Sequence, residues 1–370
     1  MNRYALIGNT FRAEAELGSG NSGVVYKAWH PRLKKNVILK ESKCGITDSN
    51  ELRRNEVEAL KNVKSAFLPQ VFDFIEEGSR AFTVMEYIDG ESFDKLLGRG
   101  QVFSQKEVIK WYRQLASALE TLHKRNICHC DVKPANIVLT PNGDICLIDF
   151  NAAIIGGNAA RFVSRTLGYA SPEQYDAYER IKSARDSIKN KSAFDNKEIL
   201  PDKAESICPE ASGMGRGYDD NRTELADYSG LFPELPPKDD LADTAGRKNP
   251  LTADEIDWKR SDIYSLGASM YHILTGKHPK GRSAEIAARP AQRHYDGFER
   301  IIEKSMRPIP AERFKSMTEL IDALDSMQNH DKSAVKSLAT GQILLYGAAA
   351  GLIAAVLVSI AAISGKRKRF

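Results

Sequence analysis

The sequence predicts an α+β fold in which a small strand-rich half precedes a larger helical half. Between about residues 11 and 88, apolar and polar residues alternate as they do in half-buried strands, with one helical stretch over residues 50–63. Residues 104–125 instead place apolar side chains at the spacing of a buried helix face. A second buried helix is predicted over residues 261–276, where Gly276 provides a stop signal.

Composition limits what such a chain can do. Its 370 residues are 42% hydrophobic and 28% charged, which suffices for a large core and fits one two-lobed unit. The formal net charge is only +4, so no broad basic field argues for a nucleic-acid partner, and none is expected. The five cysteines form no CxxC pair and indicate reduced thiols in a cytosolic setting.

Residues 343–363, ILLYGAAAGLIAAVLVSIAAI, carry no charge. As a helix they would extend for about 31 Å, which matches a hydrocarbon core of roughly 30 Å. A buried Ala-rich helix is the alternative, but a soluble helix normally shows a polar stripe. We therefore expect a transmembrane helix over 343–363, preceded by a juxtamembrane linker (329–342) and followed by a basic tail (364–370).

Small residues recur every four positions within this predicted span, at Gly347, Gly351, Ala355 and Ser359. A stripe of this type lets two membrane helices approach closely, which suggests a homodimer. Chance explains the stripe about equally well in so Ala-rich a segment.

A glycine-rich stretch, LGSGNSGVVYKA, lies near the start of the strand-rich half. Gly18, Ser19, Gly20 and Gly23 would form a turn whose backbone amides can approach phosphate oxygens. By itself this pattern is weak evidence, since a plain hairpin has the same glycines.

Fifteen residues after Val25, the stretch VILK places Lys40 at the end of an apolar strand, expected to be the next strand but one. Such a lysine usually points to solvent. Here Glu56, inside the predicted helix, could hold it inward as an ion pair, with Glu58 as the weaker candidate.

The stretch NICHCDVKPANIVL supplies Asp131, Lys133 and Asn136, and it is followed by LIDFN with Asp149 and by GYASPE with Glu173. Two aspartates and one asparagine at this spacing can provide one base and two oxygen ligands. Hard oxygen ligands are what Mg²⁺ requires when it bridges phosphates.

Together and in order, these motifs resemble the signature set of the eukaryotic-type Ser/Thr protein kinases, with bacterial members the nearest in style. The resemblance covers about residues 11–328 and implies the bilobal protein-kinase fold. The N-lobe would comprise about 11–88 and the C-lobe about 89–328, with a polar insert over about 177–256.

The resemblance implies an enzyme that transfers the γ-phosphoryl group of ATP to Ser/Thr hydroxyls of protein substrates, with Mg²⁺ or alternatively Mn²⁺. The implied catalytic residues are Asp131 and Lys133, and the implied metal ligands are Asn136 and Asp149. The implied ATP-binding residues are Gly18, Ser19, Gly20, Gly23, Val25, Lys40, Glu56, Glu86, Ile88 and Val138. Within these sets, backbone groups of Glu86 and Ile88 would bind adenine, between Val25 and Val138.

Three positions depart from the family pattern: Cys130 replaces the arginine of HRD, Asn151 the glycine of DFG, and Ile38 the alanine of VAIK. Asparagine tolerates positive φ, so the aspartate of DFG could still be placed. All the implied catalytic groups are present, which favours an active kinase over an ATP-binding pseudokinase scaffold. A small-molecule phosphotransferase lacks the combination of DVKPxN with SPE and ranks lower.

Other residues of these motifs are interpreted as structural. Asp262 and a Glu173–Arg313 pair would support the C-lobe. His129 would pack beneath Phe150 rather than bind a metal, because the flanking cysteines lack the usual ligand spacing.

Between Glu173 and Asp262 lie 88 residues where the family makes a short crossing. Much of this insert is polar and rich in Pro and Gly, which predicts a surface loop or a disordered segment. A docking or gating role is one reading, and a tolerated insertion is the other.

The implied use of ATP also bears on location. The first residues contain no apolar run long enough for a signal peptide, and a folded ATP-dependent domain is hard to export. We therefore expect a cytoplasmic kinase domain on a single-pass, C-terminal membrane anchor, although the basic tail runs against the positive-inside tendency.

Overall fold

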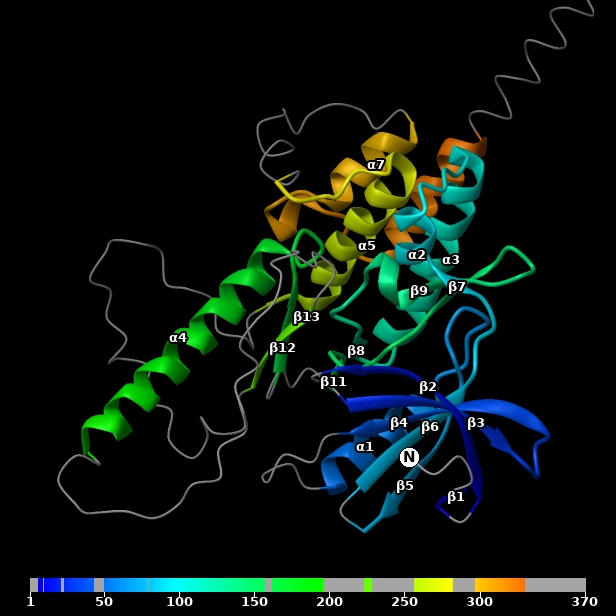
Figure 1. Ribbon diagram of the computed structural model, residues 1–370. Coiled ribbons are helices and arrows are strands. Elements are labelled where there is room, and N and C mark those ends of the chain that lie inside the picture. Colours follow the sequence, from blue (N-terminus) through cyan, green and yellow to red (C-terminus); the bar gives the residue numbers. More distant parts are fainter. Residues whose placement is uncertain are drawn as a thin grey trace, which may run out of the picture.

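The first lobe is a six-stranded antiparallel sheet with one helix packed against it (Figure 1). The computed structural model describes residues 6–8, 10–20, 23–42, 50–78, 80–156, 162–195, 223–227, 256–281 and 297–329. The sheet has the order β1-β2-β3-β4-β6-β5. Its elements are β1 (Leu6–Ile7), β2 (Phe11–Gly20), β3 (Gly23–His30), β4 (Lys35–Ser42), α1 (Asn50–Lys61), β5 (Val71–Glu77) and β6 (Arg80–Glu86).

Alternation along β4 decides which side chains reach the site. Val37 and Leu39 are fully buried in the core of the sheet. Successive side chains of a strand point to opposite faces, so Ile38 and Lys40 face the other way, and Ile38 packs against a core cluster that includes residues of both lobes. Lys40 lies directly opposite Val25 on the neighbouring strand, so the prediction that it lies one strand further on was wrong.

The second lobe is built around helices, as predicted (Figure 1). Ser104 starts α3 with a capping box closed by Glu107, and Gly276 ends α5 with a φ of 66°. The helix α5 is buried on almost every side, and Gly267 lets α7 approach, because a Cβ there would lie 2.7 Å from the Cβ of Ser305. The helices are α2 (Phe93–Gly98), α3 (Gln105–His123), α4 (Pro172–Asp195), α5 (Trp258–Thr275), α7 (Phe298–Ser305) and one over residues 317–329.

Short strands and 3-10 turns carry the loops that face the first lobe. The strands β8 and β11 pair with each other, and β9 pairs with both β7 and β10. These elements are β7 (Glu91–Ser92), β8 (Ile127–Cys128), η1 (Pro134–Asn136), β9 (Ile137–Leu139), β10 (Ile145–Leu147) and β11 (Ile154–Ile155), with η4 (Pro310–Glu312) between later helices.

Part of the insert forms a helix and a strand, which differs from the predicted loop. Helix α4 continues to Asp195, and in Figure 1 it extends away from the helical lobe. Its buried Ala177, Tyr178 and Ile181 lie on adjacent turns, a helical spacing that the polar surroundings obscured. Residues 223–227 form a strand, β13 (Thr223–Asp227), which pairs antiparallel with β12 (Phe162–Thr166).

In the part of the chain that the structure describes, no helix is both long and apolar enough to cross a membrane. The predicted span over 343–363 and its small-residue stripe lie outside the described residues. Most of the linker over 329–342 and the basic tail also lie outside them.

A buried ion pair joins α4 to the loop after η4, as predicted. Arg313 Nη1 lies 2.6 Å from Glu173 Oε1, and Nη2 lies 2.8 Å from Oε2. The guanidinium also donates to the carbonyl oxygens of Arg307, Arg260 and Pro308. Because Arg313 is 2% exposed, it depends on these acceptors for every contact that water would otherwise supply.

We predict that Arg313→Met lowers the free energy of unfolding by about 3–5 kcal/mol, since it leaves the Glu173 carboxylate buried and unpaired. The control is Arg99→Met, which removes an equally bidentate but exposed pair with Glu91. It should cost less than about 1 kcal/mol. Urea unfolding of both variants measures the difference, and equal losses would contradict a special role for the buried pair.

Candidate active site

The carboxylate of Asp262, on α5, organises the loop between β8 and η1. Its Oδ1 accepts the N–H of Cys130 at 2.8 Å, and its Oδ2 accepts the N–H of His129 at 2.8 Å. The Nε2 of His123 lies 2.8 Å from the same Oδ2. Asp262 is fully buried, so these bonds replace the water that its charge requires. The expected supporting role of Asp262 agrees with this geometry.

One group of described side chains has the spacing of metal ligands: His123, Cys128 and Asp262, whose ligand atoms lie within 4.8 Å of one another. Both oxygens of Asp262 already accept hydrogen bonds from the loop. Burial and the nearby Asp262 charge raise the pKa of the Cys128 thiol far above its ordinary value, so the thiol is neutral in this arrangement. Through Asp262, this cluster has a structural role, because it holds the loop between β8 and η1 in place.

His129 packs against Phe150, as predicted, with ring centroids 5.6 Å apart. Its Nε2 lies 3.2 Å from the carbonyl oxygen of Ile148, and its Nδ1 accepts the N–H of Asp131 at 3.4 Å. The imidazole thus links the loop that carries Asp131 to the segment that precedes Asp149.

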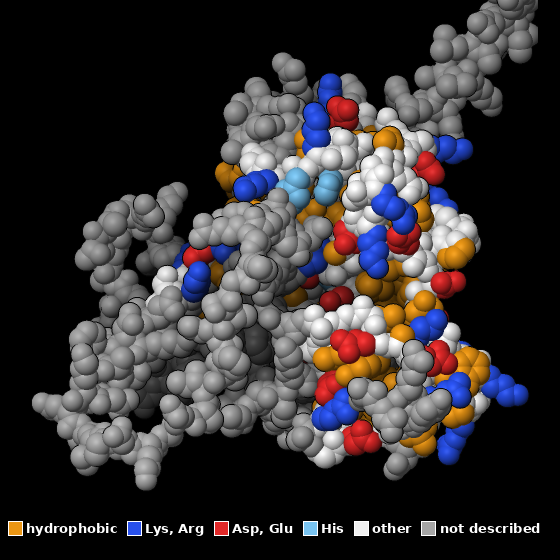
Figure 2. Space-filling model, viewed as in Figure 1, with side chains coloured by type: hydrophobic (Ala, Val, Ile, Leu, Met, Phe, Trp, Pro, Cys, Tyr) orange, Lys and Arg blue, Asp and Glu red, His pale blue; other side chains and the backbone are white. Residues whose placement is uncertain are grey.

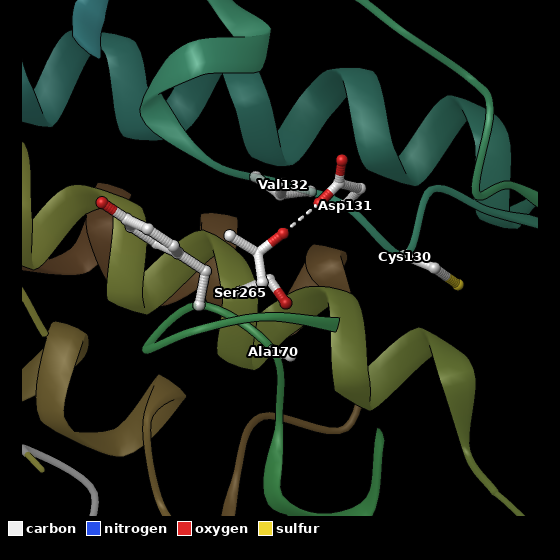
Figure 3. A pocket seen from close by; sticks show the side chains of 7 residues that line it. Cys130, Asp131, Val132, Ala170 and Ser265 are labelled. Atoms are coloured by element: carbon white, nitrogen blue, oxygen red, sulfur yellow. Dashed lines mark hydrogen bonds between the residues drawn. The ribbon is translucent and has the colours of Figure 1, made fainter. Parts of the chain in front are cut away.

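Asp131 lies at the centre of a polar constellation. Its Oδ1 accepts the hydroxyl of Thr166 at 2.9 Å, which is the dashed bond in Figure 3. Its Oδ2 accepts the amide of Asn136 at 2.9 Å and lies 3.2 Å from the ammonium of Lys133. Lys133 also donates to Thr166 at 3.3 Å. The loop and the segment with Thr166 therefore meet at a carboxylate that is positioned on both oxygens.

Asp149 is held by two neighbours. Lys40 Nζ lies 2.5 Å from its Oδ1, and the N–H of Asn151 donates to the same oxygen at 3.1 Å. Burial opposes ionisation of Asp149, but the Lys40 ammonium and these hydrogen bonds outweigh it and lower the pKa of its carboxyl. The carboxylate is thus anionic at neutral pH.

Asn151 acts differently from the expectation for the residue that replaces the glycine of DFG. The positive φ belongs to Asp149, at 70°, and Asn151 is not among the described residues with positive φ. Instead, the side-chain amide of Asn151 donates to Asp149 Oδ2 at 3.4 Å. The turn therefore gains a donor that glycine could not supply.

Lys40 pairs with Asp149 across the two lobes. Glu56 is exposed on α1, and its predicted pair with Lys40 stays a prediction. Glu58, the weaker candidate, pairs with Lys61 at 2.6 Å.

Asn136 lies beside the segment that carries Asp149, the other predicted metal ligand. Its Nδ2 donates both to Asp131 Oδ2 and to the carbonyl oxygen of Asp131, at 2.9 and 2.8 Å, so its Oδ1 is directed elsewhere. The N–H of Ile148 donates to the carbonyl of Asn136 at 2.8 Å, which places Asn136 beside the segment that carries Asp149. One amide oxygen and one carboxylate on adjacent segments are a donor set that fits Mg²⁺.

The other predicted nucleotide-binding residues lie in the first lobe, in its connection to the second lobe and, for Val138, on β9 of the second lobe. Gly18, Ser19 and Gly20 end β2, and Gly23 begins β3, so they form a hairpin. Val25 lies on β3, Val138 on β9, Glu86 at the end of β6, and Ile88 in the connection between the lobes. In Figure 2 the surface is hollowed between the lobes, with acidic side chains at the bottom of the hollow.

Cys130 is buried in an apolar cluster, 3% exposed, with a φ of 59°. In Figure 3 its sulfur points away from the Asp131 carboxylate. The cluster comprises Cys128, Cys130, Ala152, Ile154, Val163, Ala177, Tyr178, Ile181, Ile256 and Trp258. Burial raises the pKa of the Cys130 thiol well above its ordinary value, so a neutral group fills this position.

Arg165 attaches β12 to α4 at a second point, in addition to the buried Val163. Its guanidinium lies over the rings of Tyr178 and Tyr175, 4.4 and 5.4 Å from their centroids, and it pairs with Glu179. All three partners lie on α4, so β12 is fastened to this helix by cation–π and ionic contacts.

Gln174 was missed by the sequence reasoning. Its Nε2 donates to the carbonyl oxygen of Cys130 at 2.8 Å, and its Oε1 accepts the hydroxyl of Ser261. The signal available in the sequence was its position directly after SPE. Arg165 had no such signal, because its partners became recognisable only once residues 177–195 proved helical.

The two lobes, the connection between them and the constellation around Asp131 define a protein-kinase fold. A model of the protein kinase domain matches residues 11–187. A probable serine/threonine-protein kinase of Clostridium acetobutylicum is 30% identical over 176 residues, 46% of this chain and 27% of that protein. PknA of Corynebacterium glutamicum is 30% identical over 186 residues, 47% of this chain and 40% of that protein. Cyclin-dependent kinase 1 of Encephalitozoon cuniculi is 31% identical over 191 residues, 47% of this chain and 64% of that protein.

Residues 11–187 therefore form a domain of the protein-kinase family, and over this part the chain is similar to eukaryotic-type serine/threonine protein kinases. The segment that matches covers only part of each of these relatives, about a quarter of the Clostridium protein. The family match ends at residue 187, inside α4 and well before β13.

The neutral cluster around Cys130 predicts that an arginine is poorly tolerated there. Cys130→Arg should lower the free energy of unfolding by about 3–5 kcal/mol, because the charge would be buried without a partner. Cys130→Met, which is long but uncharged, is the control for size and should cost clearly less. Urea unfolding compares them, and similar losses would mean that the arginine escapes to solvent.

Proposed function

We propose that the chain is an ATP-dependent protein kinase that phosphorylates Ser/Thr hydroxyls of proteins. The observation that carries the proposal is the constellation in which Thr166, Lys133 and Asn136 all contact the carboxylate of Asp131. A substrate hydroxyl beside this carboxylate would attack the γ-phosphorus as the bond to the leaving ADP breaks. The hydroxyl proton would pass to Asp131.

Each neighbour has a role in this reaction. Thr166 and Asn136 hold the two oxygens of Asp131, which orients the carboxylate before substrate binds. The Lys133 ammonium would offset the negative charge on the transferred phosphoryl group. Asn136 and Asp149 would hold Mg²⁺, or alternatively Mn²⁺, which neutralises phosphate charge when bound.

The nucleotide would lie in the hollow between the lobes. Backbone amides of the hairpin with Gly18, Gly20 and Gly23 would approach its phosphates, and Lys40 would bind them as well. Lys40 would then exchange its contact with Asp149 for the nucleotide and Glu56. Glu86 and Ile88 would offer backbone groups to adenine.

We predict that Lys40→Met, Asp131→Asn and Asp149→Asn each abolish autophosphorylation without unfolding the protein. Loss of the positioned base alone typically lowers the rate about 10²–10⁴-fold. Asp144→Asn is the matched control, because Asp144 is a partly exposed aspartate that pairs with Lys110 outside the site. Radiolabel transfer from ATP, with thermal unfolding alongside, provides the measurement.

The alternative is an ATP-binding scaffold. A protein that binds Mg·ATP but transfers phosphate no faster than its Asp131→Asn variant, to itself or to added proteins, would establish that alternative.

Cys130 suggests how the enzyme would be activated. A kinase arginine at this position needs an anionic partner, so such enzymes wait for a phosphate on the activation loop. Here the position is neutral, and no charge awaits compensation. We therefore propose that this kinase is active without phosphorylation of its activation loop, which contains Ser164.

The prediction is that phosphatase-treated enzyme is active from the first time point and that Ser164→Ala leaves the rate nearly unchanged. Thr166→Ala serves as the contrast, since it removes the hydroxyl that contacts Asp131. Initial rates after removal of the phosphatase test this. A long lag that prior phosphorylation abolishes would refute it.

We also propose that residues 343–363 anchor the kinase to a membrane with its catalytic domain in the cytoplasm, on the basis of their length and lack of charge. The small-residue stripe supports a homodimer of this anchor.

Deletion of residues 341–370 should move the protein from the membrane pellet to the soluble fraction without loss of intrinsic activity. Gly351→Ile should weaken self-association of the span in a membrane two-hybrid assay, while Ala349→Ile, off the stripe, should not. A truncated protein that still pellets with membranes would disprove the anchor, and equal behaviour of the two isoleucine variants would disprove the stripe.

A further inference from the structure

The strand β12 packs against α4, and its last residue contacts Asp131. Val163 is buried against α4 in the Cys130 cluster, and Arg165 contacts the tyrosines of the same helix. Thr166, the last residue of the strand, donates to Asp131. An edge of β12 therefore leads directly to the base that would receive the proton of a substrate.

That edge is occupied by residues of the insert. In the antiparallel ladder, Phe162 pairs with Asp227 and Thr166 pairs with Thr223, with every residue between them in register. Paired Cα atoms in such a ladder lie about 4.5–5.5 Å apart. Thr223 thus lies beside the residue that contacts the catalytic carboxylate, and β13 runs away from the site along β12.

An extended peptide whose hydroxyl reaches Asp131 must pass close to Thr166. Strand addition to an exposed edge is a general way to bind such a peptide, because main-chain hydrogen bonds supply affinity for many sequences. We propose that the edge of β12 binds extended protein substrates by strand addition, and that residues 223–227 occupy this edge in cis until a substrate displaces them. This inference rests on the proposed kinase function.

The occupied edge can be exchanged. A two-stranded ribbon alone is marginally stable in water, and in the described part of the chain β12 and β13 form a sheet of two strands. The tether compensates, because linking a weak strand to its site gives an effective concentration on the order of millimolar. A substrate strand with comparable contacts can therefore displace β13, whereas a peptide that binds only weakly cannot.

The register also indicates which peptides suit the edge. Arg165 pairs with Glu224, one position from the Thr166–Thr223 pair. Opposite charges at directly opposed positions of an antiparallel pair are favourable. We therefore expect the edge to prefer an extended segment with an acidic residue opposite Arg165.

The test uses the full-length chain with Ala226→Pro or Leu225→Pro. Proline cannot donate to a ladder, and adjacent residues alternate in the direction of their N–H groups, so at least one variant loses a ladder bond. Ala226→Ser, which keeps the N–H, is the control. The probe is a fluorescent synthetic peptide of residues 219–231.

The peptide should bind at least one of the two proline variants at least tenfold more tightly than it binds wild type or Ala226→Ser. A peptide with Glu224→Lys should bind them more weakly. Hydrogen exchange at residues 163–166 should quicken in the proline variants and slow again when the peptide is added. Equal peptide affinity for all proteins, with unchanged exchange, would overturn the proposal.

Kinetics with casein as acceptor separate the two roles that the ladder could have. Under the proposal, the proline variants show a lower KM for casein at unchanged kcat, and added peptide raises that KM. A fall in kcat that the peptide restores would overturn it, because β13 would then only position the segment. If neither wild type nor any variant phosphorylates casein while the peptide still binds the variants with different affinities, the proposed kinase function is wrong and the proposed strand-binding edge is supported.

Discussion

The buried carboxylate of Asp262 is the constraint on which the loop that carries Asp131 depends. A charge without access to water must be satisfied by donors, and here the donors are the backbone of His129 and Cys130 and the ring of His123. Two consecutive N–H groups can reach one carboxylate only if the chain turns sharply, and Cys130 accordingly has a φ of 59°. That turn sends the side chains of Cys130 and Asp131 in opposite directions, one into a core and one into the site (Figure 3).

This division explains how the loop and the β12 segment are joined without a phosphate. On one side of the turn, Cys130 and Val163 share an apolar cluster with α4. On the other side, Asp131 and Thr166 share a hydrogen bond. Apolar burial does not depend on a modifying enzyme, so the segment can hold its place through packing alone. As a consequence, a charged residue at position 130 would be buried in this apolar cluster without a partner.

The insert extends the same logic. Its helical beginning supplies Tyr178 and Glu179, which hold Arg165, and its later strand β13 covers the edge of β12. Residues of β13, which lie outside the family match, thus pair with the strand whose last residue, Thr166, contacts Asp131. An insertion that merely looped through solvent would form no such ladder, which is why we relate it to substrate binding.

Local sequence patterns predicted the α+β order of elements, helix α3 and the end of α5 at Gly276, because these depend on local spacing and backbone geometry. Motif order likewise predicted Asp131, Lys133 and Asn136 as residues of one site, and the structure brings their side chains into contact. The partner that the structure gives Lys40, the donor role of Asn151 and the pairing of β12 with β13 required the tertiary structure. Each joins segments whose contacts depend on how the chain returns on itself, and in the polar insert no hydrophobic pattern indicates that return.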